Sequence, residues 1–150
     1  MTRLALLAIL AIAFADSSDA CSCVGVKDFW QLARESTTVV VAQVAAHEGK
    51  IESAGVPARF VVRVEEVLKG SESRKDLVFA AGAPGICVAP ASAFPVGSTW
   101  TLVVPSTTAG EPLALSMCAP GWQQVATRPG EGSGRALPLL EIKRRLRAPR

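Results

Sequence analysis

The chain of 150 residues carries 16 Lys and Arg, 13 Asp and Glu and one His, which gives a net charge of +3. Residues 21–127 contain eight basic and nine acidic side chains, whereas residues 128–150 contain seven basic and two acidic ones. A nearly neutral main segment lacks the strongly basic surface of nucleic-acid-binding domains, so no nucleic-acid partner is expected. The sequence has no Asn, which excludes N-glycosylation.

The first twenty residues have the pattern of a secretory signal peptide. Arg3 supplies a positive charge, residues 4–14 form an apolar run, and small residues precede Cys21 at the first and third positions before the cut. A membrane span needs about 20 apolar residues, and no run in the chain is that long. We therefore expect residues 1–20 to be removed and the mature chain to be secreted or otherwise extracytoplasmic. Lipid attachment to Cys21 is not expected, because Ser18 stands where lipoprotein processing requires a large aliphatic residue.

A short helix is predicted soon after the cleavage site, followed by strands. Phe29, Leu32 and Ala33 stand at positions i, i+3 and i+4, with Asp28 near the helix start. Valine-rich or alternating segments then predict strands between turn-rich stretches. The five predicted strands are residues 37–46, 59–70, 77–81, 100–104 and 113–117, with a hairpin-type loop at 48–57. This pattern favours a small closed or nearly closed barrel, so the predicted fold class is mainly β.

The C-terminal part of the chain is predicted to follow the barrel as a separate segment. Residues 122–127 predict a helical turn, residues 129–134 contain three glycines and resemble a linker, and residues 137–147 predict a basic helix. We therefore divide the mature chain into a domain at residues 21–127 and a basic tail at residues 128–150. The charge of this tail favours at most a weak contact with an anionic surface.

Four cysteines follow the cleavage site, which in an oxidising compartment predicts two disulfides. Cys21 and Cys23 are two residues apart. In an extended chain their Cα atoms are about 6.5–7 Å apart, too far for an easy bond. Each therefore needs a distant partner, and two pairings remain: Cys21 with Cys87 and Cys23 with Cys118, or the crossed alternative.

Sequence motifs of catalysis are missing. The chain contains no H-E-x-x-H, no G-x-S-x-G and no phosphate-binding glycine loop. The single histidine, His47, is interpreted as a surface loop residue. Glu65 and Glu66 are adjacent on a predicted strand and point to opposite faces, which does not favour a paired acid and base. We expect neither an enzyme nor a bound cofactor.

The order of these features resembles the N-terminal domain of the tissue inhibitors of metalloproteinases (TIMPs), and more widely the netrin-like module. The features are the signal peptide, the mature N-terminus Cys21-Ser22-Cys23-Val24, the short helix, the strand at 59–70 that ends in Leu-Lys-Gly, and then Cys87, Cys118 and Trp122. The resemblance covers about residues 21–127. Animal TIMPs have twelve cysteines and a second small subdomain, so this chain resembles a four-cysteine, single-domain form.

The resemblance implies a five-stranded OB-fold barrel with short flanking helices, and disulfides Cys21–Cys87 and Cys23–Cys118. It also implies inhibition of a zinc metalloendopeptidase, the protein partner. The α-amino nitrogen and carbonyl oxygen of Cys21 would chelate the zinc of that protease. Ser22 would point toward a specificity pocket, Cys23 and Val24 would continue along the cleft, and Gly85 and Ile86 would lie beside them.

Two other interpretations belong to different classes. Many netrin-like modules have the barrel without inhibiting a protease, so the alternative is a non-inhibitory secreted binding or structural domain. An envelope metal or redox protein would require reduced cysteines. An inhibition assay distinguishes the non-inhibitory domain from the inhibitor. Titration of free thiols distinguishes the metal or redox protein from both.

Overall fold

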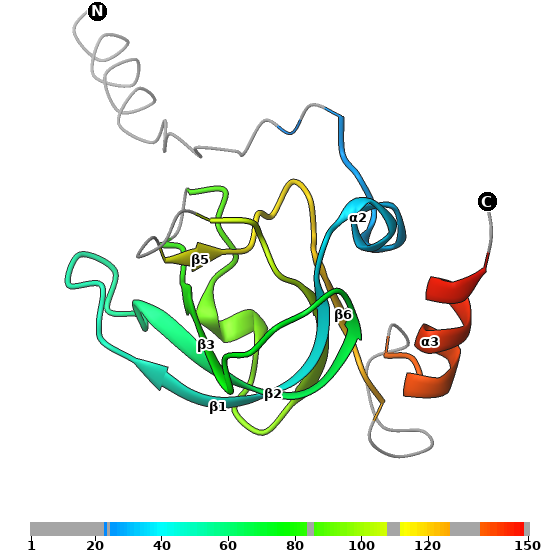
Figure 1. Cartoon of the computed structure of the whole chain (residues 1–150). Coiled ribbons are helices and arrows are strands. Elements are labelled where there is room, and N and C mark those ends of the chain that lie inside the picture. Colours follow the sequence, from blue (N-terminus) through cyan, green and yellow to red (C-terminus); the bar gives the residue numbers. More distant parts are fainter. Residues whose placement is uncertain (1–22, 24, 84–85, 108–111, 127–135, 149–150) are drawn as a thin grey trace, which may run out of the picture.

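The computed structural model describes residues 23, 25–83, 86–107, 112–126 and 136–148 (Figure 1). The predicted signal peptide and the predicted linker at 129–134 lie outside these ranges. The helices and strands are α2 (Phe29–Glu35), β1 (Val39–Glu48), β2 (Arg59–Lys69), β3 (Asp76–Ala80), the 3₁₀ turn η1 (Ala91–Ala93), β4 (Thr99–Val103), β5 (Leu113–Ala114), β6 (Trp122–Gln124) and α3 (Leu139–Arg147).

The strands form one curled half-barrel sheet in the order β5-β3-β2-β1-β4-β6 (Figure 1). Every neighbouring pair is antiparallel except β3 and β5. The register between β1 and β2 shifts at three places. Such bulges bend a strand and increase its twist, which helps the sheet to curl. The predicted mainly β class is confirmed.

The described sheet has six strands, not the five expected. The additional strand, β6, includes part of the segment predicted as a helical turn at 122–127, and that prediction is wrong. Trp122 and Gln124 pair with Leu102 and Trp100 of β4. The backbone amide of Val125 also donates to the Thr99 carbonyl at 2.9 Å. The edge of β4 carries backbone N–H and C=O groups that need hydrogen-bond partners, and β6 supplies those partners.

The concave side of the sheet encloses an aromatic core. Phe60, Phe79 and Phe94 are fully buried. The Phe60 ring stacks on Phe79 and Phe94, with ring centroids 5.3 and 4.6 Å apart. Trp100 and Trp122 meet Phe94 edge-on, which is a favoured aromatic geometry.

Both helices cover the opposite face of β1 (Figure 1). Val39 of β1 packs with α2, and Val41 packs with the fully buried Ile142 of α3. Both faces of β1 are thus covered, which explains why its apolar run is nearly continuous. The two predicted helices are confirmed, and α3, within the predicted basic tail, is packed on the sheet.

Asp28 caps the first of these helices. Its Oδ1 accepts a hydrogen bond of 2.7 Å from the Gln31 amide, which satisfies one of the free donors of the first turn. We expect Asp28→Ala to lower the free energy of unfolding by about 1 kcal/mol in urea denaturation. Glu52→Ala, at an exposed loop position, is the control and should change nothing. Equal stability of both variants would contradict the capping role.

Candidate functional site

A disulfide holds the N-terminal segment against the body of the domain. Cys23 is bonded to Cys118, with Cα atoms 5.2 Å apart and a separation of 95 positions in sequence. This bond is one of the two pairings that the resemblance implies. Cys118 follows β5 directly along the chain, since only residues 115–117 intervene. The segment after the proposed mature N-terminus is therefore fixed at one edge of the sheet.

A second segment lies beside Cys118 through backbone hydrogen bonds. The Met117 amide donates to the Cys87 carbonyl at 2.9 Å, and the Ala89 amide donates to the Leu115 carbonyl at 2.7 Å. Val88 and Ser116 form an isolated antiparallel bridge between these bonds. Residues 86–89 and 115–118 thus run side by side, and Cys23 is bonded to one end of this pair.

The predicted site residues fall into two groups. Cys21, Ser22, Val24 and Gly85 lie outside the part of the chain that the structure describes. Cys23 and Ile86 are described, and both are exposed. Cys87 is disulfide-bonded as well, although its predicted partner, Cys21, is among the residues that the structure leaves out. The structure thus brings together Cys23, Ile86 and Cys87, the described members of the predicted site.

Met117 adds an apolar side chain that the sequence did not single out. Its exposed fraction is 49%, and that of Ile86 is 50%, both high for large hydrophobic residues. A strand was predicted at 113–117, but β5 ends at Ala114, before Met117. The available signal was its position directly before Cys118. Ile86 and Met117 together form what we call the apolar edge.

The segment that carries the apolar edge is closed by a tight backbone contact at Gly82. The Gly82 amide donates to the Ala89 carbonyl at 3.0 Å. A Cβ atom added at Gly82 would lie 2.1 Å from the carbonyl oxygen of Val88, which is backbone and cannot rotate away. Only glycine therefore allows residues 82 and 88 to approach so closely.

We expect Gly82→Ala to lower the free energy of unfolding by about 1–3 kcal/mol, because the backbone near Val88 must move. Urea denaturation measures this change. NMR should show the largest amide shifts in residues 86–89 and 115–118. Ser92→Ala, at an exposed position in η1, is the control. Unchanged stability of Gly82→Ala would contradict the close backbone approach of residues 82 and 88.

The titratable residues weighed from the sequence occupy ordinary positions. His47 was predicted to be a loop residue, and that prediction is wrong. It lies near the end of β1, where its Nε2 is 2.8 Å from the Phe94 carbonyl oxygen. Strand β1 extends two residues beyond the predicted end at residue 46, so His47 pairs with Phe60 and Glu48 pairs with Arg59. Glu65 and Glu66 are exposed, as expected for surface charges. Among the described residues, no three His, Cys, Asp or Glu side chains are grouped to hold a metal ion.

Neither of the described helices is long and apolar enough to cross a membrane. The chain matches no protein-family model. It also has no significant match among curated proteins.

Proposed function

We propose that the chain is a secreted inhibitor of zinc metalloendopeptidases, built on an OB-type barrel like that of TIMPs. Its working group is the amino-terminal Cys21, exposed after removal of residues 1–20. The observation that carries the proposal is the Cys23–Cys118 disulfide, which fixes the chain two residues after the proposed terminus beside the exposed apolar edge.

The chemistry of the target explains the need for a free terminus. A catalytic zinc with three protein ligands keeps one position open for the water that attacks the peptide bond. The α-amino nitrogen and carbonyl oxygen of one residue can fill this position as a five-membered chelate and displace the water. The amine must be unprotonated to bind, and an α-amino group has a reference pKa of about 7.7–8.0, far below that of lysine.

Affinity also depends on how firmly the terminus is held. Ordering a flexible segment on binding costs free energy, and a terminus that is already fixed avoids that cost. The described disulfide fixes Cys23, and the proposed Cys21–Cys87 bond would fix the terminal residue itself. Cys87 is next to Ile86 in the chain and is hydrogen-bonded to Met117.

The apolar edge supplies the second part of the proposed contact. Exposed apolar side chains next to a rigid segment are suited to the cleft of a protease, because burying them on binding is favourable. In the proposal Ile86 and Gly85 lie along the cleft beside Ser22, Cys23 and Val24. Ser22 is the residue that enters the specificity pocket.

A panel assay tests this function. Oxidised protein that begins at Cys21 is incubated with several zinc metalloendopeptidases and, as a control, a serine protease. We expect inhibition with one-to-one stoichiometry of at least one zinc enzyme and no effect on the serine enzyme. A correctly folded protein that inhibits none of the zinc enzymes would contradict the proposal and leave the non-inhibitory netrin-like binding domain.

A further inference from the structure

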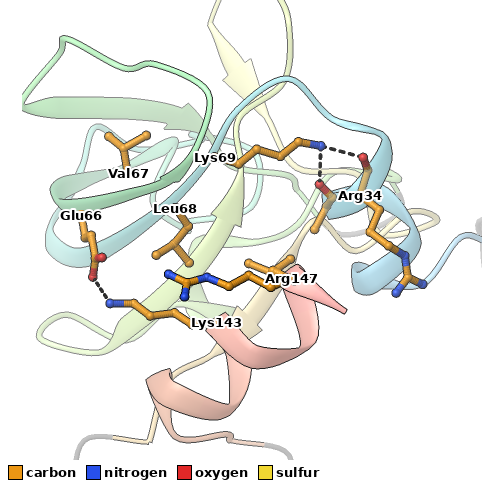
Figure 2. A pocket seen from close by; sticks show the side chains of 9 residues that line it. Arg34, Glu66, Val67, Leu68, Lys69, Lys143 and Arg147 are labelled. Atoms are coloured by element: carbon orange, nitrogen blue, oxygen red, sulfur yellow. Dashed lines mark hydrogen bonds and ion pairs between the residues drawn. The ribbon is translucent and has the colours of Figure 1, made fainter. Parts of the chain in front are cut away.

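A groove lies on the side of the molecule where both helices meet the end of β2. Its volume is about 330 Å³, and its lining comes from α2, β2 and α3 (Figure 2). The charged residues that line it are Arg34, Glu66, Lys69, Lys143 and Arg147. The cationic side chains of Lys69, Lys143 and Arg147 lie at the groove with one carboxylate, that of Glu66. The guanidinium of Arg34 points away from the groove, and its backbone carbonyl is the group turned toward Lys69 (Figure 2).

Two of these cations already have partners. The Lys69 Nζ donates to the carbonyl oxygens of Ala33 and Arg34 at 3.2 and 2.6 Å, at the carboxyl end of α2. Lys143 and Glu66 form an ion pair of 2.8 Å. Figure 2 shows these two interactions at opposite ends of the groove.

Arg147 lies between these two ends in Figure 2. Within the described parts of the chain, its guanidinium has no hydrogen bond or ion pair, and neither has that of Arg34. The two neighbouring arginines of α3 differ. Arg144 and Arg145 bond Glu141 at 2.6–2.7 Å, and their hydrogen bonds lower the pKa of Glu141 to about 2. Arg147 is thus a free donor in the middle of the groove.

The charge of the groove indicates the kind of anion that fits. The carboxyl ends of α2 and α3 both reach it, and each contributes about half a negative charge. Together with Glu66 they offset about two of the three cations, so the groove keeps a net positive charge of about +1, which favours an anion. A phosphate monoester carries nearly two negative charges at neutral pH. Arginine presents paired donors that match its oxygens.

The groove also has room and apolar surface for the organic part of such an ester. Ala33, Val67, Leu68 and Leu146 complete its lining. We propose that this groove binds a phosphate monoester, held mainly by Arg147 and flanked by Lys69 and Lys143. This site is separate from the apolar edge, because other helices and strands form it. The proposal is therefore independent of the proposed inhibition.

NMR titration of the full mature protein with glycerol 3-phosphate tests the site. We expect saturable shifts in residues 33–34, 66–69 and 143–147, with glycerol alone producing none. Arg147→Gln should weaken binding at least tenfold, since hydrogen bonds to charged groups typically contribute that much. Arg63→Gln, which removes an exposed arginine of β2, is the matched control and should leave binding unchanged. Absence of saturable shifts, or equal binding by Arg147→Gln, would overturn the proposal.

Sedimentation with vesicles identifies the source of the phosphate group. Vesicles containing phosphatidic acid are compared with vesicles of phosphatidylcholine alone. Binding to the first that is lost in Arg147→Gln assigns the groove to a lipid headgroup. Binding of glycerol 3-phosphate without vesicle binding assigns it to a soluble ester. Vesicle binding that persists in Arg147→Gln, with no binding of the soluble ester, would contradict a site in this groove.

Discussion

Replacement of Cys23 and Cys118 by serine is expected to lower the free energy of unfolding by about 4 kcal/mol. The bond joins residues that are 95 positions apart, so it removes much of the conformational freedom of the unfolded chain. A domain of this size has a total stability of about 5–15 kcal/mol, so the loss is a large fraction of it. Urea denaturation under oxidising conditions measures the difference.

Two controls separate this effect from a general disturbance. Ser106→Ala, an exposed substitution, should leave stability unchanged. A reducing agent should destabilise the natural protein more than the double variant, because the variant has one disulfide fewer to lose. If the double variant unfolds at the same urea concentration as the natural protein, the disulfide does not stabilise the domain.

The same variant also tests the link between rigidity and inhibition. At a temperature where it remains folded, it should inhibit at least tenfold more weakly, because its terminus must be ordered on binding. This loss would occur without any change in the groups that reach the zinc. Unchanged inhibition by the folded variant would show that the Cys23–Cys118 bond is not needed to present the terminus.

Strands β2 and β3 could be predicted because each buries one face in the core. Phe60 and Val62 alternate with less buried residues along β2, and Leu77 and Phe79 do so along β3. The capped helix α2 was equally clear from Asp28 and the spacing of its apolar residues. These signals lie within each segment, so they can be recognised without knowing what the segment packs against.

The parts that failed depend on distant partners. Residues 122–124 become a strand because they pair with the edge of β4. No pattern within the segment itself predicts this pairing. The exposure of Met117 depends on where β5 ends and on the neighbouring segment at 86–89. The amphipathic pattern of α3 predicted a helix, but only the structure shows that Ile142 packs with Val41 of β1 and that α3 therefore forms one wall of the groove.

An alanine added before Cys21 is expected to weaken inhibition of the target protease about a thousandfold, which corresponds to about 4 kcal/mol. The extra residue converts the terminal amine of Cys21 into an amide, whose nitrogen is a poor metal ligand, and it occupies the space next to the zinc. The fold should be unaffected, because the addition lies before Cys23, whose disulfide to Cys118 holds this segment on the domain.

The most direct test of the account is therefore a paired measurement of inhibition constants for protein that begins at Cys21 and protein that begins with the added alanine. Equal unfolding curves for the two proteins provide the control for folding, and removal of the alanine by an aminopeptidase should restore inhibition. We predict strong inhibition by the first protein and about a thousandfold weaker inhibition by the second. Equal inhibition by both would contradict zinc chelation by Cys21.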